Sequence, residues 1–210
     1  MPELQDQNTI YIVDDDAAVR DSLGALLEAV GWTVQSYGSG RAFLEVCDTG
    51  MRGCLLLDIR MPELDGLQVQ RILSQRGVTL PFIVISGHGD ISSAVRAMKA
   101  GATEFLEKPF NSEIVLRAIR AALEGDAVLR GKQATTSAAV KRLDGLTNRE
   151  RHVLDCLIVG SQNKLIARQL GISPRTVEVH RSRIMKKLNA SSLSEVVRIA
   201  LEAGALPSKT

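Results

Sequence analysis

Residues 54–58 read CLLLD, an almost wholly apolar run that ends on a carboxylate. Short runs of the same kind occur at 10–14 (IYIVD) and 82–86 (FIVIS), and apolar residues at helical spacing fill the intervals. Continuous apolar runs of this length are typical of parallel strands buried on both faces. The sequence therefore predicts an α/β fold, a five-stranded parallel doubly wound sheet with helices on both faces. The expected strands are Ile10–Asp14, Thr33–Tyr37, Cys54–Asp58, Phe82–Ser86 and Thr103–Glu107.

The last third of the chain shows only helical patterns and predicts a small all-α unit of four helices. Thr147 and Glu150 form a capping box, Gly171 ends a short amphipathic segment, and Ser173 precedes a proline at the first helical position. Ser192 with Glu195 forms another capping box. The expected helices cover about 148–160, 163–170, 174–189 and 192–203.

Between these parts, the composition changes. Residues 126–143 contain few large apolar side chains and several Gly, Ser and Thr residues, which predicts a linker that is at most partly helical. We expect three parts, with residues 1–125 as one domain, 126–143 as the linker and 144–210 as a second domain.

Charge divides the chain in the same way. Residues 1–125 contain 11 Lys and Arg against 17 Asp and Glu, whereas residues 126–210 contain 15 against 7. A basic C-terminal third is expected of a domain that binds the phosphate backbone of nucleic acid, although basic surfaces also bind membranes and acidic proteins.

Composition excludes other classes of protein. No apolar run reaches the roughly 18–20 residues that span a bilayer, and the polar start MPELQDQ does not resemble a signal peptide. The three cysteines form no CxxC pair, so neither a disulfide framework nor a zinc site is indicated. We expect a soluble, cytoplasmic protein.

Carboxylates lie at or just beyond the ends of the first and third predicted strands. Asp14 ends the first strand, Asp15 and Asp16 follow it, and Asp58 ends the third. If these two strands are neighbours, the carboxylates crowd one edge of the sheet, where they repel one another unless a hard cation neutralises them. Carboxylate oxygens suit octahedral Mg²⁺. The pattern predicts a magnesium site.

Two further polar side chains are expected at this edge. Ser86 ends the fourth strand with a hydroxyl, and Lys108 follows the fifth with an ammonium, so both could contact phosphate oxygens. Each residue alone is more typical of a helix cap or a solvated loop. Together they predict an aspartate that accepts a phosphoryl group.

Through IVDDD, LLLDIRMPELDG, VISGHGD and FLEKPF, residues 8–125 resemble the receiver domain of two-component response regulators. The resemblance implies a sensor histidine kinase as partner and a cis peptide bond between Lys108 and Pro109. It also implies a role for each residue of the site. Asp58 is the phosphoacceptor, Asp15, Asp58 and the backbone carbonyl of Arg60 bind Mg²⁺, Asp14 is the companion acid that reaches the ion through water, Ser86 and Lys108 contact the phosphoryl group, and Phe105 is the aromatic switch.

An enzyme remains the alternative from another class. A phosphatase or phosphotransferase that works through an aspartyl-phosphate, with the basic domain as a scaffold, would use the same nucleophile and metal. Haloacid-dehalogenase-like enzymes carry a second Asp two residues after the nucleophile, where this chain has Arg60, and no GxxxxGK[ST] motif occurs. A third reading is a transcription factor that works without phosphorylation.

Residues 165–188, LIARQLGISPRTVEVHRSRIMKKL, form two predicted helices joined by a short turn that contains glycine, the pattern of a helix-turn-helix. Val177, Ile184 and Leu188 share a stripe that should face inward. An opposite polar and basic face could enter the major groove of DNA. This face carries Arg175, Glu178, Val179, Ser182 and Lys186.

Residues 144–207 resemble the LuxR-type output domain of the FixJ/NarL group of regulators, through LTNRE, LGIS, RTVEVHRSRIMKKL and SLSEVVRIAL. The resemblance implies that Glu178, Val179 and Ser182 face the bases of double-stranded DNA. SGHGD with EKPF indicates the FixJ branch, which favours activation through RNA polymerase over repression but leaves both open. Implied phosphate contacts are Lys164, Thr176, Arg181, Lys186 and Lys187.

Taken together, these patterns predict a DNA-binding transcriptional response regulator rather than an enzyme. We expect phosphorylation to favour a homodimer, since the acidic receiver could mask the basic domain until its population shifts. The faces available are Asp90–Leu123 and the last helix, 192–203, although that helix could simply complete the four-helix core.

Overall fold

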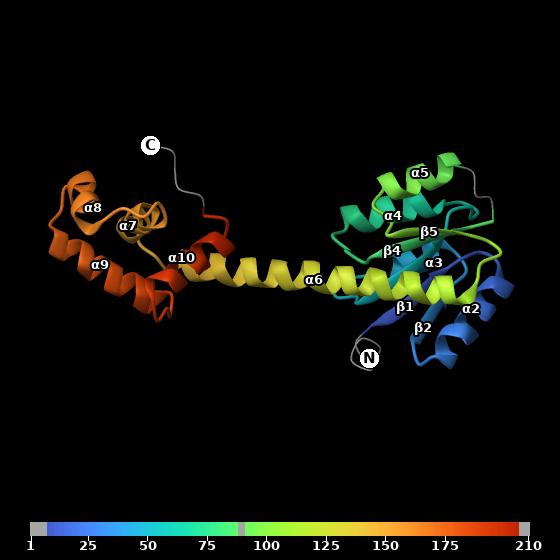
Figure 1. Ribbon diagram of the computed structural model, residues 1–210. Coiled ribbons are helices and arrows are strands. Elements are labelled where there is room, and N and C mark those ends of the chain that lie inside the picture. The colour runs from blue at the N-terminus through green and yellow to red at the C-terminus, as the bar shows by residue number, and fades with distance from the viewer. Residues whose placement is uncertain (1–7, 88–90, 206–210) are drawn as a thin grey trace. The chain divides into compact units, whose positions relative to one another are not determined.

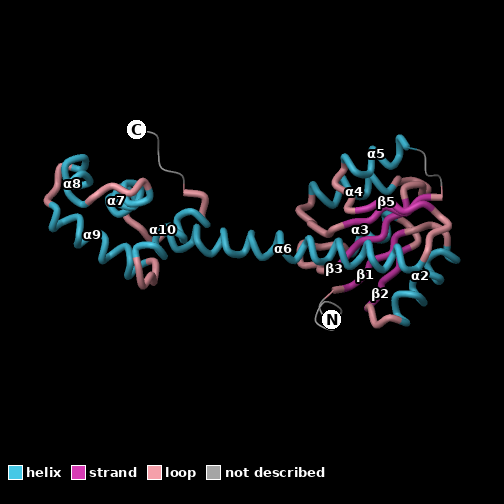
Figure 2. The backbone as a smooth tube through the Cα atoms, in the orientation of Figure 1, coloured by secondary structure: helices cyan, strands magenta, loops and turns pink. Residues whose placement is uncertain are grey.

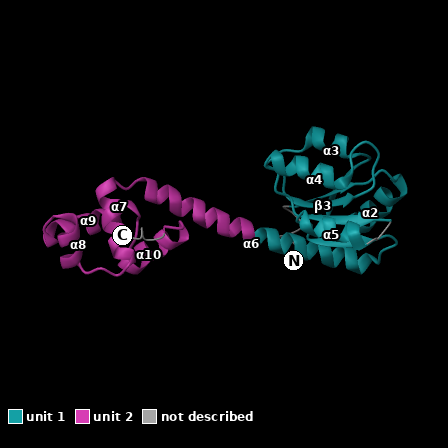
Figure 3. Ribbon diagram, turned by 90° about the horizontal axis from the view of Figure 1, so that it is seen from above, with its two compact units in different colours: residues 1–128 teal, residues 129–210 magenta. Residues whose placement is uncertain are grey.

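The computed structural model describes residues 8–87 and 91–205. The chain divides into two compact units, residues 1–128 and 129–210, which Figure 3 distinguishes by colour. Asp90, expected as one end of a dimer face, lies outside the described residues.

A five-stranded parallel sheet forms the centre of the first unit (Figure 2). The strand order is β2-β1-β3-β4-β5, and the register pairs Val13 of β1 with Leu57 of β3. This confirms the predicted fold, with strand boundaries within one residue of those expected. The strands are β1 (Thr9–Val13), β2 (Thr33–Tyr37), β3 (Gly53–Asp58), β4 (Phe82–Ser86) and β5 (Glu104–Glu107).

Helices cover both faces of this sheet because the strand residues are apolar on both sides (Figure 1). On one face, Leu55 and Leu57 pack against α3 (Gly40–Val46), α4 (Gly66–Gln75) and α5 (Ile91–Lys99). On the other face, Ile10 and Leu56 pack against α2 (Ala17–Ala29) and the first turns of α6 (Ser112–Asp144). Asp14, Asp58, Ser86 and Lys108 lie at or just after the carboxyl ends of these strands.

The expected linker is helical throughout, because α6 runs without a break from Ser112 to Asp144. The prediction of partial helix at most was wrong. The absence of large apolar residues indicates only that a segment does not pack, and no residue of 124–138 is buried. A helix satisfies its backbone hydrogen bonds internally, and Ala, Leu, Arg, Lys and Gln in this stretch all favour it.

The second unit is a helical bundle of the last turns of α6 with α7 (Asn148–Ile158), α8 (Asn163–Leu170), α9 (Pro174–Lys187) and α10 (Leu193–Glu202). Its predicted caps form. Thr147 and Glu150 make the capping box, and Gly171 ends α8 with a φ of 65°. Ser192 caps α10, but the Glu195 carboxylate accepts from Ser191 instead of completing the second box.

None of the helices in the described residues is long and apolar enough to cross a bilayer.

Candidate functional site

The strand order brings the predicted carboxylates together. Asp14 follows β1 and Asp58 ends β3, its direct neighbour in the sheet. Carboxylate oxygens of Asp14, Asp15 and Asp58 lie within 4.8 Å of one another. Asp14 is 2% and Asp58 6% exposed, whereas Asp15 is exposed, so the cluster has a buried floor and one open side.

Lys108 brings a positive charge to these acids from the end of β5. Its Nζ lies 2.6 Å from Asp14 Oδ2 and 3.7 Å from Asp58 Oδ2. The Lys108 backbone N–H donates to Ser86 O at 2.8 Å, and the peptide bond between Lys108 and Pro109 is cis, as expected. The Lys108 side chain therefore reaches from the end of β5 to Asp58, the last residue of β3, and to Asp14, which follows β1.

Burial decides the electrostatics of Asp58. It raises the pKa of the Asp58 carboxyl to about 6, against the opposing effect of Lys108 and a backbone hydrogen bond from Arg60, while the nearby charges of Asp14 and Asp15 raise it further. Asp58 Oδ1 is buried and has no hydrogen-bond partner among the described residues. A carboxylate oxygen that is buried, unpaired and close to two other carboxylates fits a hard divalent cation, so this cluster could bind a metal ion.

Asp14 is held on both carboxylate oxygens. Its Oδ1 accepts from the Asp16 backbone N–H at 3.0 Å, and its Oδ2 accepts from Lys108. Asp16 itself caps α2, because its Oδ1 accepts from the Ala18 N–H at 2.9 Å. Of the three acids after β1, Asp16 thus has the structural role that an aspartate after a strand commonly has.

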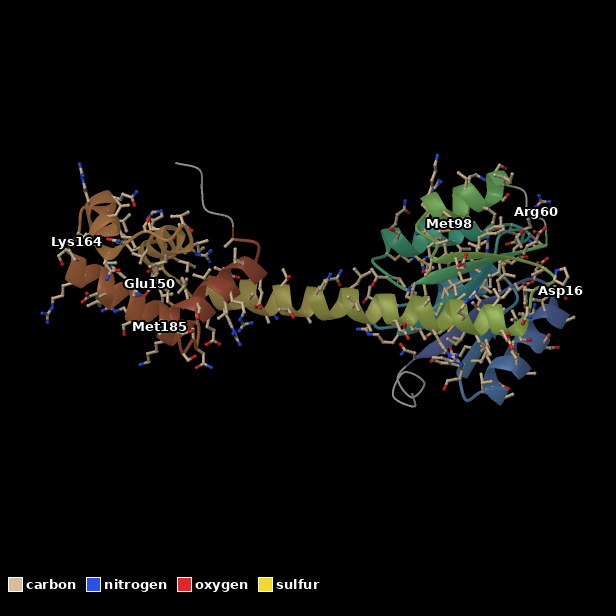
Figure 4. The ribbon with its side chains drawn as sticks, in the orientation of Figure 1. Asp16, Arg60, Met98, Glu150, Lys164 and Met185 are labelled. Atoms are coloured by element: carbon tan, nitrogen blue, oxygen red, sulfur yellow. The ribbon has the colours of Figure 1, made fainter. Side chains whose placement is uncertain are left out.

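Of the remaining predicted residues, Ser86 and Arg60 lie at the same edge, and Phe105 lies within β5. Ser86 is the last residue of β4 and is buried, and Phe105 in β5 is partly buried against the sheet's core. Arg60 follows β3 and is exposed, and Figure 4 shows it with Asp16 at one end of the unit. Gly66, at the start of α4, allows close approach to β3, since a Cβ there would overlap the Asp58 carbonyl oxygen.

In the second unit, α8 and α9 form the helix-turn-helix. Val177, Ile184 and Leu188 are fully buried, as predicted from their spacing. The predicted outer face is exposed along α9, including Val179, whose exposed fraction of 44% is high for an apolar side chain. Lys164 lies on α8, as labelled in Figure 4, and is exposed as well.

Three of the predicted phosphate contacts have partners within the protein. Lys187 Nζ lies 2.7 Å from Glu150 Oε2, Arg181 donates to Asn163 Oδ1 at 2.7 Å, and the Thr176 hydroxyl lies 2.8 Å from Ser173 Oγ. Lys164 and Lys186 have no hydrogen bond or ion pair within residues 8–87 and 91–205. The partners of Lys187, Arg181 and Thr176 were not predicted from the sequence.

Glu150 has two structural roles in this unit. It completes the capping box of α7, and it also pairs with Lys187 of α9. It is 3% exposed, and the hydrogen bond from Lys187 lowers its pKa to about 2. The capping-box pattern identified Glu150 as a helix cap, but its pairing with a residue far along the chain gave no local signal.

Two family models match the chain. One describes the response regulator receiver domain and covers residues 10–120, and the other describes bacterial regulatory proteins of the luxR family and covers residues 144–200.

Several relatives and two solved structures match nearly the whole chain. The transcriptional regulatory protein FixJ of Azorhizobium caulinodans is 48% identical over 94% of this chain and 94% of its own. The response regulator protein TodT of Pseudomonas putida is 44% identical over 91% of this chain and 85% of its own. The structure of the response regulator StyR, 41% identical, covers 93% of this chain and 99% of its own with a TM-score of 0.83.

Proposed function

Since the chain belongs to the response regulators that join a receiver domain to a LuxR-family DNA-binding domain, we propose that Asp58 is the residue through which phosphorylation controls it. The family makes the protein a phosphorylation-activated, DNA-binding transcription regulator, with a histidine kinase as phosphodonor. One observation carries the assignment of Asp58. Asp58 is buried, and one of its carboxylate oxygens has no hydrogen-bond partner among the described residues. The carboxylates of Asp14 and Asp15 and the ammonium of Lys108 lie around it.

In the proposed reaction, a carboxylate oxygen of Asp58 attacks phosphorus and the bond from phosphorus to the donor nitrogen or oxygen breaks, which leaves a mixed anhydride on Asp58. The attacking group must be ionised, and a pKa of about 6 leaves most of Asp58 charged at neutral pH. Lys108 would then turn from Asp14 toward a phosphoryl oxygen, and the Ser86 hydroxyl would contact another.

Asp15, Asp58 and the backbone carbonyl of Arg60 would hold Mg²⁺ directly, with Asp14 reaching it through water. The hydrogen bonds already made by both Asp14 oxygens support an indirect role for that residue. Bound there, Mg²⁺ would neutralise the carboxylates and the charge on the transferring phosphoryl group.

On the DNA side, we propose that α9 enters the major groove, with Glu178, Val179 and Ser182 toward the bases. Their exposure on one face of α9, opposite the buried stripe, supports this. Arg175, Lys164 and Lys186 would contact phosphates. Thr176, Arg181 and Lys187 could contact phosphates only by giving up or sharing their present hydrogen bonds within the protein.

We assign residues 1–125 to the receiver, 126–143 to the linker and 144–210 to the output domain. The first unit's core ends at Leu123 and the second unit's core begins at Ala139, which supports this division. Phosphorylation would favour a homodimer through the α5 face, where Ile91, Val95 and Met98 are exposed at helical spacing. Transcription would then be activated through RNA polymerase.

One experiment tests this function. The full chain is incubated with acetyl phosphate and Mg²⁺, and its phosphorylation, its turnover and its affinity for DNA are measured. We expect stoichiometric labelling, slow loss of the group and tighter DNA binding. Sustained hydrolysis of phosphate monoesters would instead identify an enzyme, and unchanged DNA binding after full labelling would contradict the proposal.

A further inference from the structure

Arg20, in the first turns of α2, holds the loop that carries Asp14 and Asp15. Its Nη1 donates to the backbone carbonyl oxygen of Asp14 at 2.8 Å and to that of Asp15 at 3.1 Å. Arg20 is half-buried, and Leu23 and Leu27 anchor its helix in the core of the sheet. The helix that carries the guanidinium is therefore held against the sheet while the guanidinium contacts the loop.

These two carbonyl groups belong to the peptide units on either side of the Asp15 Cα. Because each peptide unit is planar, fixing both units fixes the two backbone dihedrals of Asp15 and hence the direction of its Cα–Cβ bond. The Asp15 side chain is exposed and has no hydrogen bond or ion pair within the part of the chain that the structure describes. Its carboxylate position thus depends on the backbone, whereas Asp14 is held by contacts to its own oxygens.

We propose that Arg20 is a positioning residue for the metal site: it directs the Asp15 carboxylate toward Asp58 before a cation binds. This inference rests on the proposed function, because the cation is the Mg²⁺ of that proposal. Preorganising one of two carboxylate ligands strengthens binding, since less conformational entropy is lost when the ion arrives.

The charge of Arg20 would have the opposite effect. A guanidinium near the carboxylates repels a dication, so an Arg20 that acted through charge alone would weaken cation binding. Removing the side chain therefore separates the two roles by the sign of the change in Mg²⁺ affinity.

Arg52 supplies a matched control, because its Nη1 also donates to two consecutive carbonyl groups, those of Gly50 and Met51, at 3.0 and 2.9 Å. It lies immediately before β3, at the opposite end of that strand from Asp58. Arg52→Met removes the same charge and the same kind of contact from the same unit.

The experiment titrates the full chain with Mg²⁺ alone by calorimetry. Arg20→Met should raise the dissociation constant about ten-fold, in the range found for residues that orient metal ligands, and Arg52→Met should leave it unchanged. Arg20→Lys should fall between, because an ammonium can still donate to these carbonyl groups but lacks the fixed planar geometry of the guanidinium. With acetyl phosphate, Arg20→Met should raise the half-saturating Mg²⁺ concentration and leave the rate at saturating Mg²⁺ close to that of the wild type.

Each other outcome decides the question. Tighter or unchanged Mg²⁺ binding in Arg20→Met overturns the positioning role, as does an equal loss in Arg52→Met. If the wild type binds Mg²⁺ and Asp58→Asn weakens that binding while Arg20→Met does not, only this inference fails. If the wild type binds no Mg²⁺, the proposed metal site fails with it.

Discussion

The Lys108 ammonium lies closer to Asp14 than to Asp58, at 2.6 Å against 3.7 Å. The lysine thus pairs mainly with the companion acid, and one oxygen of Asp58 stays unpaired among the described residues. A phosphoryl group on Asp58 would place new anionic oxygens beside Lys108 and compete with Asp14 for it. This competition gives the receiver a local change that depends on phosphorylation.

Replacing Lys108 should separate metal binding from the response. Lys108→Ala removes a cation from the acidic cluster, so Mg²⁺ should bind at least as tightly as in the wild type. Phosphorylation should no longer raise DNA affinity, because the group that reads the phosphoryl oxygens is gone. Calorimetry with Mg²⁺ and DNA binding before and after acetyl phosphate check this. Arg120→Met, an exposed charge on α6, is the control, and loss of Mg²⁺ binding in Lys108→Ala would show that the lysine organises the metal site instead.

Phosphorylation should depend on Asp58 and not on its acidic neighbour Asp16. Asp58→Asn should abolish labelling by acetyl phosphate in the presence of Mg²⁺, because the amide is no nucleophile. Asp16→Asn should label normally, since asparagine also caps helices well and the Asp16 side chain contacts α2, while only its backbone N–H contacts Asp14. Intact-mass measurement distinguishes the variants. Full labelling of Asp58→Asn would place the phosphoacceptor elsewhere.

Asp58 should destabilise the metal-free receiver at neutral pH. Its pKa is about 6 in the folded chain and 3.8 when unperturbed, so the folded state binds the proton more tightly. The stabilisation by protonated Asp58 is complete below about pH 4 and is lost as the pH rises to about 6. With a chelator at pH 7, Asp58→Asn should therefore be more stable by roughly 2–3 kcal/mol, and the difference should shrink toward pH 4.

Trp32 provides the measurement for this comparison, because it is the only tryptophan and is buried in the core of the first unit. Urea denaturation followed by its fluorescence reports the receiver alone. Mg²⁺ should stabilise the wild type more than Asp58→Asn, since it binds the folded state. If the wild type and Asp58→Asn are equally stable at pH 7 in chelator, the charge on Asp58 does not destabilise the folded receiver.

The accuracy of sequence reasoning differed between local and non-local features. The strands and caps were predictable because apolar runs and capping residues act over a few neighbours, as at Cys54–Asp58 and Thr147. The long helix α6 was missed because the prediction treated the lack of a packing face at 124–138 as a lack of helix. The Lys187–Glu150 pair joins residues 37 apart in sequence, and no pattern within either helix indicates that partnership.

Lys186 and Lys187 are neighbours on α9 with different expected roles. Lys186→Ala should weaken binding to all DNA sequences and reduce the slope of log affinity against log salt by about 1, because an unpaired cation is lost. Lys187→Ala should chiefly destabilise the second unit, by roughly 1–3 kcal/mol, because it leaves the buried Glu150 carboxylate with one hydrogen bond fewer. Salt-dependent DNA titrations and denaturation followed by far-ultraviolet circular dichroism separate them. Equal effects of both variants in both assays would contradict this division.

We expect self-association after phosphorylation to bury the exposed apolar face of α5. Val95 is 45% exposed between Ile91 and Met98, so Val95→Asp would place a charge at the centre of the proposed interface, where burying it unpaired is costly. The variant should accept the phosphoryl group normally, stay monomeric in analytical ultracentrifugation and bind a two-half-site DNA more weakly than the phosphorylated wild type. Val46→Asp, at a valine of 50% exposure on α3, makes the same change away from α5 and should dimerise. If phosphorylated Val95→Asp dimerises as the wild type does, the interface lies on another face. The next face to test is that of α10, because Leu201 is 56% exposed there. Val196, Ile199 and Ala200 of the same helix fill the core.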